Sequence, residues 1–277
     1  MPRAWSTTAR QPPPEKGDDP VTVLVTGFGP FLGQVPINSS WEIASHLPAL
    51  IPASLSNPTP IRIYVHHEPI RVAYRPVIAL APTLLPPSSP IYPKPDIILH
   101  IGLAAGRPFY TLEEGSHARG YGSLTDVDGE RYPDSLGLEK WPEGEYPNRL
   151  LTSFNTKDVL RRWRRALGYG DADSVPKDAE VPDVRISKDA GNFMCGFIYY
   201  NSLAHYYSIK KDEKPVVFLH VPDLSDSEEK LETGREVAIA LIKALVESRR
   251  EVGVVEEEWR GKAKEEVRSA PTDVNFA

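Results

Sequence analysis

The chain has a single cysteine, Cys195, among its 277 residues. One thiol excludes an intramolecular disulfide and a zinc site built from cysteines, and it favours a reducing compartment. Residues 1–19 lack the apolar core of a signal peptide, and no run approaches the roughly 18 consecutive apolar residues of a membrane helix. These absences predict a soluble, cytoplasmic protein.

Clustered positive charge is also lacking. The 32 Lys and Arg residues are outnumbered by 38 Asp and Glu residues, which gives a net charge of -6. Nucleic acids and anionic membranes attract clustered Lys and Arg, so neither is expected as a partner. The short basic run "RRWRR" at 161–165 is interpreted as the solvated side of a helix. Nothing in the sequence indicates an oligomeric state.

Proline is abundant, with 28 residues, about twice the average share. Because proline breaks helix interiors and central strands, its clusters predict loops or linkers at 12–20, 48–60, 82–95 and 132–147. The expected organisation is a disordered tail over 1–19, one α/β domain over 20–250 and a polar tail over 251–277. An acidic, proline-rich stretch at about 122–150 is expected to be a loop insertion on the surface.

Short apolar runs predict buried strands: "VTVLVT" from 21, "IRIYV" from 61, "DIILHI" from 96 and "VVFLH" from 216. Helical patterns separate them. Ser39 and Glu42 have capping-box spacing, Thr156 and Asp158 could open a second helix, and 228–250 is the clearest helical stretch. Alternating strands and helices predict a mostly parallel sheet covered on both faces.

Ligands bind outside the carboxyl ends of such strands. The loop after the first strand, "GFGPFLG", fits a dinucleotide-binding fingerprint poorly, because Gly33 comes one residue late and Pro30 follows the second glycine. Phe28 and Phe31 in this loop are interpreted first as residues of the hydrophobic core. In a pocket they would suit a flat, uncharged ligand, with Asn38 bonding its polar edge.

Cys195 has two interpretations. A free cysteine is often a small buried apolar residue. Here, however, it follows the turn-like "DAGN" and precedes "GFIYYNSLAHYY", which can form a helix. A thiol at a helix N-terminus meets the positive end of the dipole, which favours the thiolate, and backbone N–H groups that could hold an oxyanion.

A nucleophilic thiol needs a base and a group that orients the base. Of the seven histidines, His220 is the best base on topology, because it closes the last predicted strand 25 positions after the cysteine. The loop after "DIILHI" offers Glu113 and Glu114 as the orienting carboxylate. Spacing alone does not choose between them.

The chain resembles the pyroglutamyl peptidase type I family, cysteine peptidases that remove pyroglutamate from peptide N-termini. The resemblance rests on stretches that occur in the family's order over about 200 residues: "VTGFGPFLG" with "NSSW", "IGLAAGR" with "TLEEGSHARGY", "DAGNFMCGFIYYNSL" and "FLHVPDL". It implies a single-domain, three-layer α/β/α sandwich that acts on peptides with an N-terminal pyroglutamate and needs no metal or cofactor.

The resemblance also implies roles for individual residues. Cys195 matches the nucleophile, His220 its base and Glu113 the third catalytic member, so that the reaction passes through a thioester. The residues that match the substrate site are Asn38, which bonds the pyroglutamyl ring, and the apolar Phe28, Phe31, Phe193 and Met194 around it.

The chain departs from the family in three places. The loop from Phe31 to Asn38 is one residue longer, Leu103 replaces a glutamine common in bacterial members, and the 122–150 segment has no clear bacterial counterpart. These departures leave an alternative, a catalytically weak or inactive member that binds pyroglutamyl peptides.

Overall fold

The computed structural model describes residues 20–31, 36–55, 57–86, 92–170 and 181–255. The predicted N-terminal tail, most of the predicted C-terminal tail and residues 32–35 of the lengthened loop lie outside these ranges.

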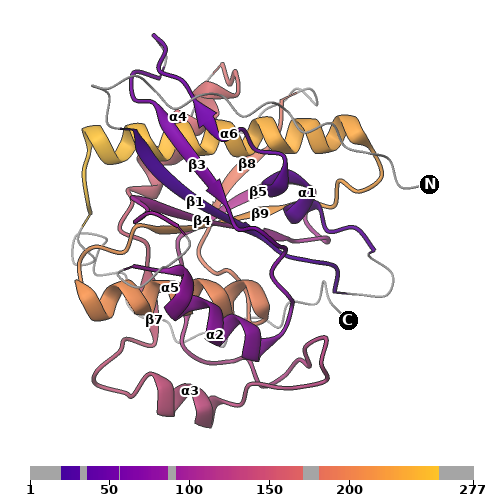
Figure 1. The fold of residues 1–277 in the computed structure, drawn as a ribbon, viewed down its shortest axis with the longest axis vertical. Helices are drawn as coiled ribbons and strands as arrows, with labels where there is room; N and C mark the ends of the chain where they lie inside the picture. Colours follow the sequence, from indigo (N-terminus) through magenta and orange to yellow (C-terminus); the bar gives the residue numbers. More distant parts are fainter. Residues whose placement is uncertain (1–19, 32–35, 56, 87–91, 171–180, 256–277) are drawn as a thin grey trace.

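A seven-stranded sheet forms the centre of the described part of the chain (Figure 1). Its strands follow one another in the order β2 (Leu50–Ile51), β3 (Ile61–Val65), β1 (Val21–Gly27), β4 (Ile97–Leu103), β9 (Val216–Val221), β5 (Tyr110–Glu113) and β8 (Val184–Ser187). The four strands predicted from apolar runs are the adjacent, mutually parallel β3, β1, β4 and β9. They are recognisable because a strand covered on both faces is apolar along its length.

The outer strands break the parallel pattern. β2 runs antiparallel to β3, and β5 runs antiparallel to β9 while pairing in parallel with β8. Four of the six strand pairs in this sheet are nevertheless parallel, so the prediction of a mostly parallel sheet is confirmed. The reversal at β5 could not be inferred from the alternation of strands and helices.

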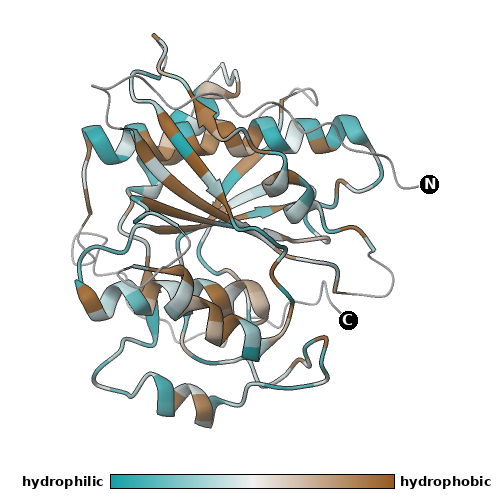
Figure 2. Ribbon diagram, viewed as in Figure 1, coloured by the Kyte–Doolittle hydropathy of each residue, from teal (hydrophilic) through white to brown (hydrophobic). Residues whose placement is uncertain are grey.

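Helices cover both faces of the sheet, so the predicted three-layer sandwich is confirmed. One face carries α1 (Ser39–Ser45), α4 (Thr156–Ala166) and α6 (Glu228–Glu251), and the other carries α2 (Tyr74–Leu84) and α5 (Met194–Ile209). Figure 2 shows apolar residues concentrated along the strands between these layers. No helix among the described residues is long and apolar enough to cross a membrane.

Two predicted helix starts are one residue late. Asn38, not Ser39, caps α1 by accepting a hydrogen bond from the Ser40 N–H, and Asn155, not Thr156, caps α4. Asparagine is a strong N-cap, because its short side chain reaches the amides of the first turn. The prediction for α6 holds, with Ser227 as its cap.

The interpretation of "RRWRR" as a solvated face holds for Arg161 and Arg165, which are exposed, but is wrong for the middle of the run. Trp163 is fully buried and donates from its indole to the Val237 carbonyl. Arg164 is also buried and donates to the Val184 carbonyl at the edge strand β8. The run therefore ties α4 to α6 and to the sheet.

The 122–150 segment is more than a surface loop. It contains α3 (Asp134–Lys140), and its last residues begin β7 (Arg149–Leu151), which pairs with β6 (Gly115–His117). The Tyr132 and Trp141 rings are buried, with their centroids 4.6 and 6.2 Å from that of Phe197 on α5. Apolar burial of these aromatic rings anchors the segment over α5 and adds to the core.

Candidate active site

Cys195 and His220 come together because of the register of two central strands. Gly102 of β4 pairs with His220 of β9. A Cβ built on Gly102 would lie 2.8 Å from Sγ of Cys195. The thiol therefore lies directly over Gly102, and neighbouring strands are only about 4.8 Å apart. His220 shares this face of the sheet, since Phe218, two positions earlier on the strand, also contacts the Gly102 position.

The backbone around Cys195 is tightly constrained. Cys195 is the second residue of α5, and the first backbone hydrogen bond of this helix runs from Phe197 N–H to the Phe193 carbonyl. The Met194, Cys195 and Gly196 amides thus lie in the first turn, where N–H groups have no partner within the helix. A Cβ on Gly196 would lie 1.9 Å from the Gly191 carbonyl oxygen. Only glycine allows this close approach of the preceding turn.

Glu113 is fully buried, and one of its oxygens is the focus of three hydrogen bonds. Oε1 lies 2.8 Å from Nδ1 of His220 and accepts from Nη1 of Arg107 and Oγ1 of Thr111, each at 2.9 Å. The antiparallel pairing explains this geometry. Thr111 lies opposite His220, and Glu113, two residues further along β5, is on the same face as Thr111 and reaches His220 diagonally.

The structure distinguishes the two adjacent glutamates. Glu113 ends the strand β5 and is fully buried, so its expected position in a loop is wrong. Glu114 points elsewhere, and its Oε1 accepts a hydrogen bond from Oγ1 of Thr156 on α4 at 3.0 Å. Of these two glutamates, it is Glu113 that contacts His220.

His100 lies on the same strand as Gly102 but is a core residue. It is fully buried, with Nδ1 at 2.7 Å from Oγ1 of Thr26 and Nε2 at 2.9 Å from Oγ of Ser202. Burial lowers the pKa of His100 to about 3, which keeps its imidazole neutral. Both ring nitrogens are engaged, so this histidine has no nitrogen left to serve the thiol.

A small pocket opens beside Cys195. It brings together all five residues expected to bind substrate, together with Cys195, Val72 and Leu103. The walls are apolar apart from Asn38 and the thiol. The dinucleotide interpretation of "GFGPFLG" gains nothing from the structure, since a Cβ on Gly27 would lie 2.7 Å from the Ser40 carbonyl oxygen, and close packing against α1 accounts for this glycine.

Asn38 has a structural role as well as a place in the pocket. Its Oδ1 accepts from the Ser40 N–H at 3.1 Å and from the Ser40 hydroxyl at 2.8 Å, and its Nδ2 donates to the Gly29 carbonyl at 2.9 Å. The side-chain amide carries a second N–H. A contact between Asn38 and a ligand would use that hydrogen.

Three residues of the site were missed by the sequence analysis: Arg107, Thr111 and Val72. The spacing of Thr111 and Glu113 was a usable signal, because residues two apart in a strand share a face. Arg107 and Val72 had no such signal, because they reach the site through turns.

Comparison with known proteins gives the family. No family model matches the chain. Human pyroglutamyl-peptidase 1 is 31% identical over 204 residues, which cover 73% of this chain and 79% of the human protein. The chain belongs to the pyroglutamyl peptidase I family.

A second relative agrees with this assignment, and two solved structures share the fold. Mouse pyroglutamyl-peptidase 1 is 30% identical over 237 residues, which cover 85% of this pyroglutamyl peptidase family member and 91% of the mouse protein. A mutant pyrrolidone carboxyl peptidase from Pyrococcus furiosus has the same fold, with a TM-score of 0.59 at 24% identity over 82% of this chain and 99% of that one. Pyroglutamyl peptidase I from Bacillus amyloliquefaciens gives a TM-score of 0.56 at 21% identity, over 82% and 97% of the two chains.

Proposed function

We propose that this chain removes pyroglutamate from peptide N-termini, with Cys195 as nucleophile, His220 as its base and Glu113 orienting the base. The observation that carries this proposal is the buried contact between His220 and Glu113. His220 pairs with Gly102 on the neighbouring strand, and the Cys195 thiol lies over Gly102. The names of the relatives, pyroglutamyl-peptidase 1 and pyrrolidone-carboxylate peptidase, support the substrate class.

Recognition rests on the pocket. A pyroglutamyl ring carries no charged amine, so apolar walls formed by Phe28, Phe31 and Phe193 suit it. In this proposal the second N–H of Asn38 donates to the lactam carbonyl, which the position of Asn38 in the pocket lining supports. A buried donor or acceptor without a partner costs about 1 to 3 kcal/mol of binding free energy. A prolyl ring lacks the lactam carbonyl and would leave the Asn38 donor unpaired. The pocket therefore favours pyroglutamyl over prolyl substrates.

The hydrogen bond to Glu113 uses Nδ1 of His220, so Nε2 is the nitrogen that serves the thiol. The Cys195 thiolate attacks the carbonyl that joins pyroglutamate to the next residue. Amides in the first turn of α5 hold the oxyanion, and protonated His220 gives its proton to the leaving amine. Water, activated by His220, then cleaves the thioester.

Arg107 and Thr111 act as positioning residues. Both donate to the oxygen of Glu113 that contacts His220, so they fix the carboxylate in the orientation that the imidazole requires. The positive charge of Arg107 also compensates a carboxylate that has no exposure to water.

A pyroglutamyl-peptide binding protein without efficient turnover is the second candidate, motivated by Leu103 in the pocket wall. The buried Glu113–His220 contact favours catalysis, because binding a ring in the pocket does not require it. The test is release of a fluorescent amine from its pyroglutamyl amide beside the prolyl amide. Turnover of the first alone supports the peptidase, whereas tight binding of the pyroglutamyl amide without turnover supports the binding protein.

A further inference from the structure

A group of metal-ligating side chains lies outside the candidate active site. His66, His67 and Glu68 directly follow β3 at the carboxyl edge of the sheet. The backbone N–H of His66 donates to the Val25 carbonyl at 2.8 Å, which fixes the start of this segment against β1. None of the three side chains takes part in the proposed peptidase reaction.

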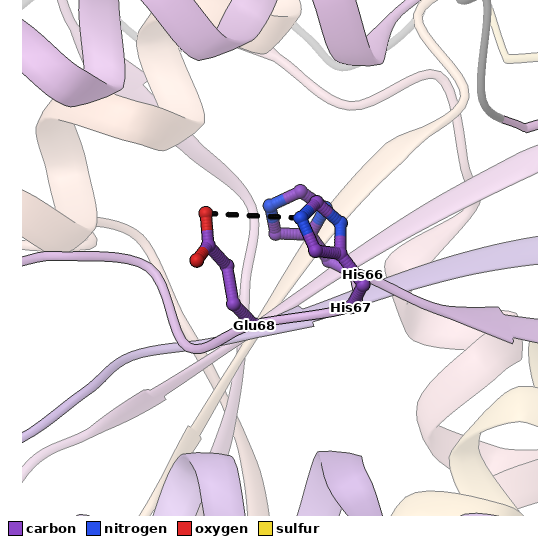
Figure 3. Close-up of side chains that lie close together, drawn as sticks. All are labelled: His66, His67 and Glu68. Carbon is purple, nitrogen blue, oxygen red and sulfur yellow. Dashed lines mark ion pairs between the residues drawn. The ribbon is translucent and has the colours of Figure 1, made fainter.

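The three side chains converge. Each offers one ligand atom within 4.8 Å of the other two. Nε2 of His67 lies 3.8 Å from Oε1 of Glu68, and the two imidazole centroids are 4.5 Å apart. Figure 3 shows the Glu68 carboxylate facing the pair of rings.

The Tyr92 hydroxyl contacts both rings. Its hydroxyl lies 3.2 Å from Nδ1 of His66 and 3.1 Å from Nδ1 of His67, and it accepts the His67 backbone N–H at 2.9 Å. The hydroxyl has two lone pairs and already accepts the His67 backbone N–H, so it can accept from only one ring N–H. If that N–H is Nδ1 of the buried His66, Nε2 of His66 is left for a ligand. Histidines that bind metals are oriented in this manner, through a hydrogen bond at the second ring nitrogen.

The donor set selects the kind of cation. Two imidazoles and one carboxylate are the ligands of open zinc sites, whereas calcium and magnesium prefer oxygen ligands alone. Ligand atoms around tetrahedral zinc are about 3.3 Å apart, so these must approach by up to about 1.5 Å. The His67 and Glu68 side chains are 59% and 68% exposed and can rotate into place around the buried His66.

We propose that His66, His67 and Glu68 form a binding site for one zinc-class divalent cation, with Tyr92 orienting the His66 imidazole and water completing the coordination. The site is separate from the peptidase reaction and does not depend on it. The same segment continues to Ile70, which pairs with Gly27 and Gly29, and to Val72 in the pocket wall. A bound cation would therefore stabilise the strand end that supports this wall.

The test is zinc titration of the full chain against a chromophoric chelator, in a Cys195→Ser background, because a thiolate near a histidine is itself a strong zinc ligand. We expect one zinc ion per chain. Tyr92→Phe should weaken binding about tenfold, and His67→Ala and Glu68→Gln should weaken it at least as much. His46→Ala, which removes another partly exposed histidine, is the matched control and should leave the affinity unchanged.

A second readout separates binding at this site from binding elsewhere. Zinc should raise the melting temperature of the Cys195→Ser protein and have no such effect after His67→Ala is added, because only the native state holds the site. His67 and Glu68 are exposed, so these variants should keep the circular dichroism spectrum of the parent. Absence of stoichiometric zinc, or equal affinity in the His67→Ala and His46→Ala proteins, would overturn the proposal.

Discussion

Nδ1 of His220 lies 2.8 Å from Oε1 of Glu113, in a pair whose side chains are 3% and 0% exposed. These residues are 107 positions apart in the sequence. They meet because β5 pairs antiparallel with β9, the strand that carries His220. In this register Glu113 lies opposite Phe218, two residues from His220. The contact occupies Nδ1 and leaves Nε2 for the proposed proton transfer with Cys195, so the proposed mechanism depends on it.

Replacing Glu113 by Gln keeps the shape of the side chain and removes its charge. The amide can no longer stabilise a protonated His220, and we expect kcat to fall by on the order of 10³- to 10⁴-fold, as in related triads. KM should change much less, because Glu113 does not line the pocket. Steady-state kinetics on a pyroglutamyl amide measures both, and a kcat within a few-fold of the parent would show that the carboxylate is dispensable.

Replacing Arg107 by Met should cost both stability and rate. The Glu113 carboxylate would remain buried without its cation, and because Arg107 is 21% exposed, we expect a loss of about 2 to 3 kcal/mol in the free energy of unfolding, below the range for fully buried pairs. Arg75, whose side chain is 81% exposed beside Glu130, provides the control. Arg75→Met should cost less than about 1 kcal/mol. Urea denaturation compares the two, and equal losses would argue against the positioning role.

His100 should make the fold less stable in mild acid. Its pKa in the native protein is about 3, against 6.5 in the unfolded chain, so below pH 6.5 the unfolded state binds a proton that the native state does not. Stability therefore falls as the pH drops from 6.5 toward 3, and this residue alone contributes a loss of about 2 kcal/mol between pH 7 and pH 5.

The measurement for His100 is the free energy of unfolding at pH 7 and pH 5 in the parent and in His100→Gln. The variant should lose about 2 kcal/mol less than the parent over this interval. His46→Gln, at the partly exposed C-cap of α1, is the control for the loss of an imidazole elsewhere in the chain. An unchanged dependence in His100→Gln would mean that another group controls acid stability.

Gly102→Ala tests the position of the thiol. The added methyl would lie 2.8 Å from Sγ of Cys195 and 2.6 Å from Cζ of Phe218, both too close for real contacts. We expect a destabilisation of about 1 to 3 kcal/mol and loss of most activity as the thiol is displaced. Gly170→Ala, whose methyl would have no atom of the described residues within 4 Å, is the control and should be fully active. Activity is measured beside the rate of Cys195 alkylation by iodoacetamide.

The sequence predicts the parts of this molecule that local pattern determines. The central strands are continuous apolar runs, Cys195 lies at the start of a recognisable helix and His220 lies near the end of a strand, so the fold class and two members of the proposed triad follow from nearby residues. The choice of Glu113 over Glu114 does not, because it depends on pairing between distant strands. The contributions of Arg107 and of the aromatic residues in the 122–150 segment depend on tertiary packing in the same way.

The most direct test of the account is the activity of Cys195→Ala on a pyroglutamyl amide, measured on protein whose melting temperature matches that of the parent. The account predicts that turnover is lost while the variant still binds the pyroglutamyl product in the pocket. Turnover at the parental rate in the folded variant would contradict it, since no other residue of the chain carries a thiol.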